Sequence, residues 1–177
     1  FDRPSSAWTY VLFTPLLDGH PLAWQVFTLT LRWLTAAAMY WTFAAVWPQA
    51  KRAMAAAALL FLVYPVFSQQ SLSVTYHQMW LEYLLFFISL GAMVQAVRAL
   101  RRPHPHTGYL LWTLLPLLAF GVNFSISEYF IGVELLRPLL IWYILNERAL
   151  DRRLHLRHTL LNWLPYIAAL GFFVYWR

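Results

Sequence analysis

The sequence predicts an all-α fold, a polytopic transmembrane helical bundle of about six membrane-spanning helices preceded by an N-terminal interfacial helix. Of the 177 residues, 61% are hydrophobic and only 11% are charged, which is too little polarity to cover a water-exposed surface. The apolar residues form long runs, and the short links between the runs carry most of the basic residues. The surplus apolar surface is therefore expected to face lipid.

The opening segment, residues 1–20, contains the helix-start signal Ser5-Ser6, the run AWTYVLFTPLL and the turn Asp18-Gly19. It is shorter than the roughly 20 apolar residues that a crossing requires, so we expect an amphipathic helix lying at the outer interface, or a re-entrant segment. The spanning helices are expected over residues 22–47, 53–67, 79–100, 109–126, 128–145 and 160–176. They form a single transmembrane domain, 1–177, which we interpret as a fragment because the chain begins at Phe1 and stops where an apolar run finishes.

The distribution of basic residues predicts how the bundle is oriented. Nine of the thirteen lysines and arginines lie in three alternate links: Lys51, Arg52, Arg98, Arg101, Arg102, Arg148, Arg152, Arg153 and Arg157. The opposite links, 68–78 and 123–127, contain none. Because cytoplasmic loops retain positive charge, we predict a multi-pass protein of the bacterial inner membrane with its basic links in the cytoplasm.

The charge and the residue types exclude several classes of site. The net charge of +6 arises from the links between apolar runs and not from one basic face, so no nucleic-acid partner is expected. The chain has no cysteine, which excludes disulfides, thiolate metal sites and a cysteine nucleophile within these residues. His104 and His106 have no carboxylate or third histidine near them in sequence, so no metal site is predicted there.

Ionisable side chains at membrane depth are costly unless they are paired or hydrated, and they therefore mark candidate functional positions. Five residues within or beside the predicted spans meet this condition: Arg32, Glu82, Glu128, Glu134 and Arg137. Their depths predict a polar cavity that opens outward. Glu134 and Arg137 are three residues apart and share a helix face, where a charge pair lowers the cost of burying both. In the alternative interpretation, Arg137 binds an anionic headgroup or phosphate and Glu134 orients it.

Two further groups of polar residues fall on the predicted outer side. Asp2 is a candidate general base toward a hydroxyl acceptor, or a ligand for a divalent cation, and the alternative is a solvated loop charge beside Arg3. His77 and Gln78 follow Tyr76 in an outer link that combines hydrogen-bonding groups with aromatic rings. Such a mixture suits a sugar, and an ordinary interfacial aromatic belt contains the same residue types.

Three segments carry a resemblance to a known family: FDRPSSAWTYVLFTPLL, LVYPVFSQQSLSVTYHQ and SEYFIGVELLRPLLIW. Through its outer-side Asp-Arg-Pro, the interfacial helix that follows and its polar outer face, the chain resembles the bacterial C-type membrane glycosyltransferases, near the dolichol-phosphate-mannose and aminoarabinose transferase types. The resemblance implies an enzyme of the cell envelope that takes a sugar from a polyprenyl-phosphate carrier, with Asp2 as the catalytic acidic residue. The paired acidic motif usual in that family does not occur in residues 1–177.

Three functions follow as hypotheses. The first is a membrane glycosyltransferase of the hexosyltransferase type, whose partners are membrane lipid and a polyprenyl-phosphate-linked sugar. Its substrate-binding residues are expected to be Arg3, His77, Gln78, Glu82, Glu128, Glu134 and Arg137. The second is a transporter or flippase-like protein in which the same charges line a path. The third is a non-catalytic membrane subunit whose charged pairs only fix helix packing.

Overall fold

The computed structural model describes residues 7–17, 19–64, 73–100, 105–146 and 152–176, and these residues form helices without any strand. In chain order the elements are α1 (Ala7–Leu17), α2 (Pro21–Val46), η2 (Pro48–Ala50), α3 (Lys51–Val63), α4 (Ser73–Ala99), α5 (Pro105–Ile126), η4 (Gly132–Leu135), α6 (Leu136–Asn146) and α7 (Arg152–Trp176). The prediction of an all-helical fold is therefore confirmed for this part of the chain.

Local sequence accounts for several helix ends. Pro21 opens α2, where its fixed φ suits a helix and its missing N–H is not needed. Trp47 leaves the helical region at φ −120° and ψ 73°, because Pro48 follows it and disfavours α backbone at the preceding residue. Tyr64 ends α3 for the same reason, since residue 65 is also a proline.

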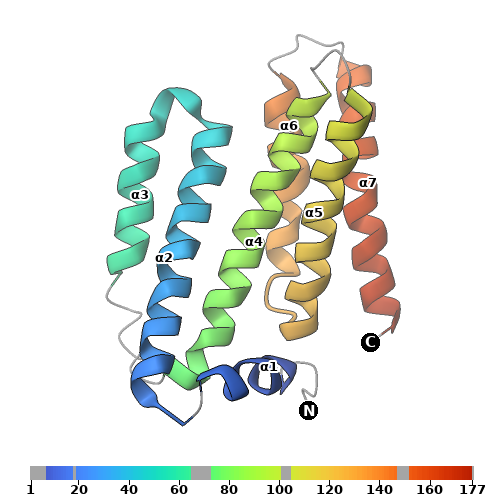
Figure 1. Cartoon of the computed structure of the whole chain (residues 1–177). Helices are drawn as coiled ribbons and strands as arrows, with labels where there is room; N and C mark the ends of the chain where they lie inside the picture. Colours follow the sequence, from blue (N-terminus) through green and yellow to red (C-terminus); the bar gives the residue numbers. More distant parts are fainter. Residues whose placement is uncertain (1–6, 18, 65–72, 101–104, 147–151, 177) are drawn as a thin grey trace.

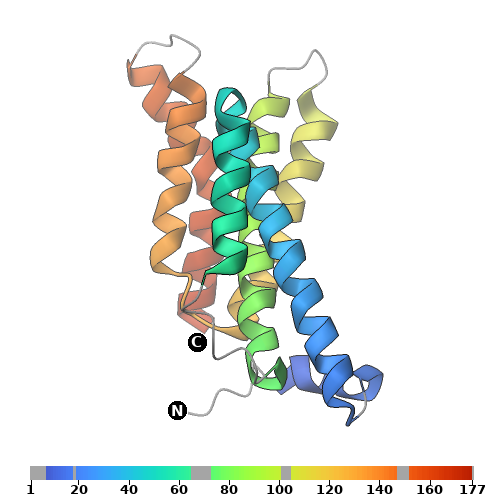
Figure 2. The same ribbon diagram turned by 90° about the vertical axis from the view of Figure 1, so that its left-hand side faces the viewer.

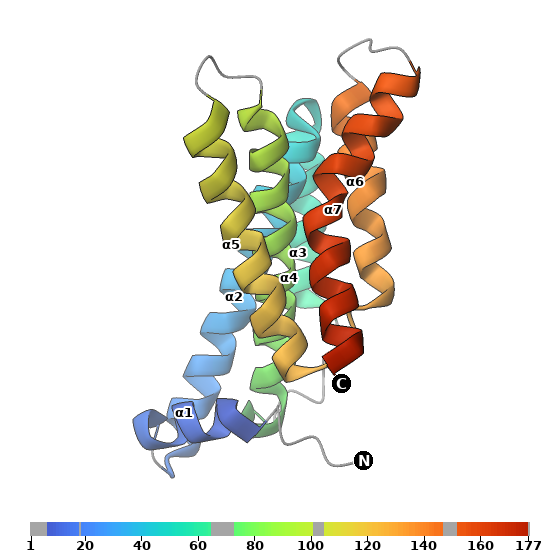
Figure 3. The ribbon, with the colours of Figure 1, turned by 90° about the vertical axis from the view of Figure 1, so that its right-hand side faces the viewer.

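Helix α4 is the central element of the bundle. It packs against α2 on one side, against α5 on another and against α6 on a third, while α7 packs against α6 and α5. Helix α3 contacts mainly α2 and lies at the edge of the bundle (Figures 1 and 2). Helix α1 lies across one end of the bundle, approximately perpendicular to the other helices (Figures 1 and 3).

Three of the described helical segments are long and apolar enough to cross a membrane: Ser73–Ala99, Gly108–Ile126 and Arg152–Trp176. Helix α2 has comparable length, 26 residues, but Arg32 and several threonines lower its hydropathy. The 13 residues of α3 rise only about 20 Å, and the 11 residues of α6 about 16 Å, against a hydrocarbon layer of about 30 Å.

The chain direction reverses from α2 to α3, from α4 to α5 and from α6 to α7 at the same end of the bundle (Figure 1). That end is here called the basic end, because the elements that meet there carry Lys51, Arg52, Arg98, Arg152 and Arg153. The opposite end, where α1 lies, is called the α1 end. The sorting of basic links to one end of the bundle follows the alternation expected from the sequence.

A ladder of threonines joins α2 to α4. Their hydroxyls donate to α4 carbonyls: Thr28 to Ser73 at 3.2 Å, Thr35 to Trp80 at 3.2 Å and Thr42 to Phe87 at 2.8 Å. Each partner lies 45 residues further along the chain, so the two helices run parallel. The repeat of seven residues is that of left-handed helix pairs. In a bilayer such a bond contributes about 0.6 kcal/mol on average.

Gly91 allows the close approach of α2 and α4. A Cβ atom at this position would lie 2.2 Å and 2.5 Å from ring carbons of Trp41 and 2.7 Å from the Thr42 hydroxyl oxygen. Small residues at a helix interface let backbones approach closely in this way. The threonine hydroxyls of α2 can therefore reach the α4 carbonyls.

Antiparallel contacts join α4 to α5 with the same seven-residue repeat. The Ser89 hydroxyl donates to the Pro116 carbonyl at 2.8 Å, and the Asn123 amide donates to the Glu82 carbonyl at 2.7 Å. A step of seven residues along α4 thus corresponds to a step of seven residues back along α5. Helix α4 consequently offers polar groups to both neighbours while its apolar side chains fill the spaces between them.

The observed helices differ from the expected ones in five places. Helix α3 ends at Val63, before Pro65, where the expected helix ran to residue 67, and α5 begins at Pro105, four residues before the expected start. Helix α4 starts six residues earlier than expected, so His77 and Gln78 lie on a helix and not in a link. Helix α7 begins at Arg152, because the cationic stretch before residue 160 is helical and continuous with the apolar run. The helix expected over 128–145 is broken: turns lead into η4, and α6 begins only at Leu136. Pro138 lies in the first turn of α6, where its missing N–H costs nothing.

The exposed surface of α1 is mostly apolar, with Thr14 as its exposed polar residue, and this corrects the expectation of an amphipathic helix. Val11 and Leu16 are 74% exposed, and Leu12 is also exposed. The buried residue of α1 is the polar Thr9. The face of α1 that turns away from the bundle therefore suits lipid better than water.

Replacement of Gly91 by alanine is expected to lower stability. The new methyl group would have to displace the Trp41 ring, and overpacking of this kind costs typically about 1–3 kcal/mol. Unfolding of the purified protein in mixed detergent micelles would measure the change. Gly121→Ala in α5 is the matched control, because nothing lies within 4 Å of its Cβ position. Equal stability of the two variants would show that α2 and α4 do not approach closely at Gly91.

Candidate functional site

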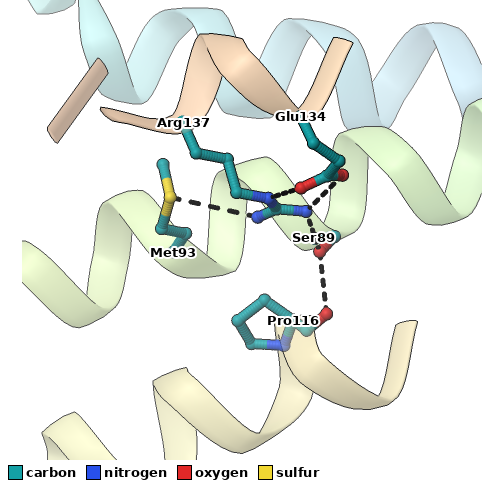
Figure 4. A network of polar contacts seen from close by, with 5 residues as sticks. All are labelled: Ser89, Met93, Pro116, Glu134 and Arg137. Atoms are coloured by element: carbon teal, nitrogen blue, oxygen red, sulfur yellow. Dashed lines mark hydrogen bonds and ion pairs between the residues drawn. The ribbon is translucent and has the colours of Figure 1, made fainter. Parts of the chain in front are cut away.

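Two buried charged residues form an ion pair between η4 and α6. Arg137 is 0% exposed and Glu134 is 5% exposed. The Arg137 Nη2 atom donates to Glu134 Oε1 at 2.9 Å, and its Nε atom also pairs with Glu134 Oε2 (Figure 4). The pair predicted from the three-residue spacing is therefore confirmed. Its two parallel contacts are the geometry that an arginine and a carboxylate prefer.

The guanidinium of Arg137 also contacts α4. Its Nη2 atom donates to Ser89 Oγ at 2.8 Å, and its Nη1 atom lies 3.9 Å from the sulfur of Met93. Ser89 also links Arg137 to α5, because its hydroxyl donates a hydrogen bond to the Pro116 carbonyl (Figure 4). Ser89 and Met93 are four residues apart and so lie on the same face of α4.

Two aromatic rings complete the surroundings of the guanidinium. Its central carbon lies 4.6 Å from the ring centroid of Tyr166 in α7 and 5.9 Å from that of Phe120 in α5. Rings at such distances attract a cation. Arg137 thus contacts α4, α5, α7 and its own neighbour η4, and we call these contacts the Arg137 network.

Little space borders the Arg137 network among the described residues. The cavity that borders Glu134 and Tyr166 measures about 10 Å³, which is at most the space of one water molecule. The donors of the guanidinium are directed at protein atoms. In this arrangement the network joins η4 and α6 to α4.

The break before α6 is what brings Glu134 and Arg137 to this position. Residues 127–131 form turns closed by backbone hydrogen bonds, including Ser127 N–H to the Asn123 carbonyl at 3.1 Å and Ile131 N–H to the Glu128 carbonyl at 3.2 Å. Phe130 anchors the break by packing its ring 5.4 Å from Tyr83 and 5.0 Å from Phe86. Non-helical backbone within a membrane bundle is stable where protein buries it in this way.

A second polar cluster, the His77 cluster, ties α1 to the start of α4. His77 is 0% exposed, and its Nδ1 atom donates to the Val74 carbonyl at 2.5 Å. The Thr9 hydroxyl lies 3.2 Å from His77 Nε2, and the Gln78 amide donates to the Thr9 oxygen at 2.8 Å. Because a carbonyl only accepts, the Nδ1 atom carries the proton, and the Thr9 hydroxyl donates to Nε2 of the neutral ring.

Aromatic side chains enclose the imidazole of His77. Its ring centroid lies 5.0 Å from that of Tyr10 and 5.1 Å from that of Trp24, and two further rings, Phe13 and Phe27, lie near 6 Å. Helix α1 is also attached to α5, because the Trp8 indole N–H donates a hydrogen bond to the Ser125 hydroxyl at 3.2 Å. Helix α1 is thereby fixed across the α1 end at both α4 and α5.

The structure does not gather the residues expected to bind substrate into one site. Twelve residues, or about 18 Å of helix rise, separate His77 from Ser89 of the Arg137 network. Glu82 lies between them, is 5% exposed, and offers its carbonyl to Asn123. Glu128 is exposed beyond the end of α5. Asp2 and Arg3 lie outside the described residues, as does His104.

The sequence alone did not single out Thr9, Ser89, Met93 and Tyr166, which complete the two clusters, or Asn123, which joins α5 to α4. Two of these residues, Ser89 and Asn123, could have been predicted from a seven-residue spacing. Glu82 and Ser89 are seven residues apart in α4, and Pro116 and Asn123 are seven residues apart in α5. Thr9 and Tyr166 gave no signal, because their partners are remote in sequence. Among the described residues, no group of three or more histidines and carboxylates is placed to hold a metal ion.

No protein-family model, no curated protein and no solved structure matches the chain. The functional conclusions therefore depend on the residues and their contacts.

A double-mutant cycle on the ion pair is expected to show strong coupling. Arg137→Met and Glu134→Leu should each destabilise the protein by about 3–5 kcal/mol, because each leaves one buried charge without its partner. The double variant should recover much of this loss, since no unpaired charge remains. Unfolding in mixed micelles measures the three variants, and Arg153→Met, at an exposed arginine of α7, provides the control. Additive losses would contradict a paired, buried site.

Proposed function

We propose that the chain is the membrane-embedded part of a multi-pass protein of the bacterial inner membrane. Its long apolar helices and the many exposed leucines, valines and aromatic residues on their outer faces support this placement. The basic end would face the cytoplasm, because positive residues are retained there. The six passes would consist of the longer helices α2, α4, α5 and α7 and of two shorter ones, α3 and the η4–α6 pair.

We propose further that this protein is a glycosyltransferase acting at the α1 end, on the outer face of the membrane. The observation that carries the proposal is the docking of α1 across that end through Thr9 and Trp8. Asp2 precedes Ala7 by five residues, and no more than about 18 Å of extended chain can separate them. In this proposal Asp2 and Arg3, which precede α1 in sequence, act at that end.

The proposed reaction uses Asp2 as a general base. Its carboxylate takes the proton from an acceptor hydroxyl, whose oxygen forms a bond to the anomeric carbon of the sugar. The bond from that carbon to the carrier phosphate breaks, and polyprenyl phosphate leaves with inversion at the carbon. Arg3 would hold the carrier phosphate, for which a guanidinium is suited, while Gln78 and Glu128 are placed at the same end to contact sugar hydroxyls.

In this proposal the buried residues act through packing. Glu134 and Arg137 hold η4 and α6 against α4, and His77 holds α1 against α4. The Arg137 contacts would hold the helices α4 and α6 together, and the His77 contacts would hold α1 in one position on α4. In this proposal Arg3, and not Arg137, holds the carrier phosphate.

The full-length protein in proteoliposomes allows a direct test of Asp2. Loss of a general base lowers turnover by about 10²-fold to 10⁴-fold, so Asp2→Asn should reduce transfer of radiolabelled sugar from its polyprenyl-phosphate carrier by at least that lower factor. Arg3→Gln should raise KM for the carrier. Asp18→Asn, a matched acid after α1 in sequence, is the control. Transfer that is unchanged in both Asp2→Asn and Arg3→Gln would overturn the residue assignment.

A transporter or flippase is a second candidate function. A third is a non-catalytic subunit, in which the Arg137 network would serve only to fix the packing of the helices. Cysteine labelling distinguishes a transporter or flippase from the glycosyltransferase. Single cysteines can be introduced without background labelling, because the chain has no native cysteine. Glu128→Cys should react only with reagent added outside and Lys51→Cys only with reagent inside. Ser89→Cys should react from neither side. Labelling of Ser89→Cys from both sides would instead support a transport path through α4 and α5.

A further inference from the structure

A groove of about 260 Å³ lies between α2 and α3, away from both polar clusters. Trp33 and Tyr40 of α2 border it on one side and Leu59 of α3 on the other, while the buried Ala36 and Ala58 form its floor. Trp33 is 57% exposed and Leu59 is 58% exposed, so both side chains project as rims. The alanines create the groove, because their methyl groups leave space that longer side chains would fill.

Positive charge lies at the end of this groove. On α3, Lys51 precedes the lining residue Ala55 by four positions, so both share one helix face with Ala58, Leu59 and Leu62 further along. The rise from Lys51 to Ala55 is only about 6 Å. Lys51 and its neighbour Arg52 are exposed at the basic end. An apolar groove thus continues directly into a pair of cations.

We propose that the groove binds one anionic phospholipid, with an acyl chain between α2 and α3 and its phosphate at Lys51 and Arg52. The apolar lining suits a hydrocarbon chain, and basic residues at the membrane surface attract anionic headgroups. A second helix, about 10–12 Å wide, would rest on the rims of Trp33 and Leu59 and would leave the alanine floor empty. The proposal depends on the membrane placement above and is independent of sugar transfer.

The position of α3 gives this lipid a structural consequence. Helix α3 is shorter than the bilayer is thick, and among the described elements it packs mainly on α2. Its main further contacts come from Phe61, whose ring lies 5.9 Å from Trp80 and 5.8 Å from Tyr83 of α4. A lipid in the groove would therefore cover the other side of α3 and hold it against α2.

Native mass spectrometry of the full-length protein, released from micelles containing phosphatidylglycerol or phosphatidylcholine, tests the proposal. The wild-type protein should retain phosphatidylglycerol preferentially. Lys51→Gln/Arg52→Gln should weaken this retention by about tenfold or more, while the control Arg152→Gln/Arg153→Gln, at the same end, should not. Equal retention in the two double variants would overturn the role of Lys51 and Arg52.

Filling the groove provides an independent test. Ala37→Phe/Ala55→Phe should abolish retention of phosphatidylglycerol, whereas Ala56→Phe, on an exposed part of α3 outside the groove, should leave it unchanged. Circular dichroism and thermal unfolding confirm that the variants fold. Unchanged retention in the filled variant would overturn the proposal and show that the lipid binds elsewhere. A dimer present in the wild-type spectra and lost from those of the filled variant would also overturn it, because a second copy of the chain would then occupy the groove. A protein that fails to partition into the membrane fraction would instead refute the membrane placement itself.

Discussion

The burial of the Arg137 guanidinium is the constraint on which the arrangement of α4 to α7 depends. A buried charge without compensation costs several kcal/mol, so every group around it must be in place at once. Glu134 supplies the opposite charge, Ser89 accepts a hydrogen bond, and Tyr166 offers its ring. These partners come from different helices, and the guanidinium therefore fixes their relative positions in a way that lipid-like apolar packing does not.

Helix α4 transmits this constraint to the rest of the bundle. On one side its Ser89 hydroxyl binds α5 and the Arg137 network, and on the other its carbonyls accept the threonine ladder of α2. Gly91, about one turn beyond Phe87, allows the close approach of α2. A helix that is apolar in composition thus makes specific contacts on opposite faces.

The two polar clusters are both buried, and they differ in where they lie along the bundle. The Arg137 network is closed and stabilises the bundle, whereas the His77 cluster lies at the α1 end and fixes the helix that follows Asp2 and Arg3 in sequence. In the proposed function, sugar transfer takes place at the end formed by α1 and the ends of α4 and α5. The same separation explains why buried charge in a membrane bundle is by itself a poor guide to a binding residue.

The sequence by itself determined the helical class, the alternation of basic links and the pairing of Glu134 with Arg137. Each of these properties follows from residue composition or from the spacing of residues within one segment, and neither requires knowledge of how the helices pack. Only the tertiary structure decided that the helix expected over 128–145 breaks before Leu136, and that Thr9 meets His77 and Ser89 meets Arg137. These contacts join residues 48 to 68 positions apart, and their geometry arises only when helices pack and every buried polar group must find a partner.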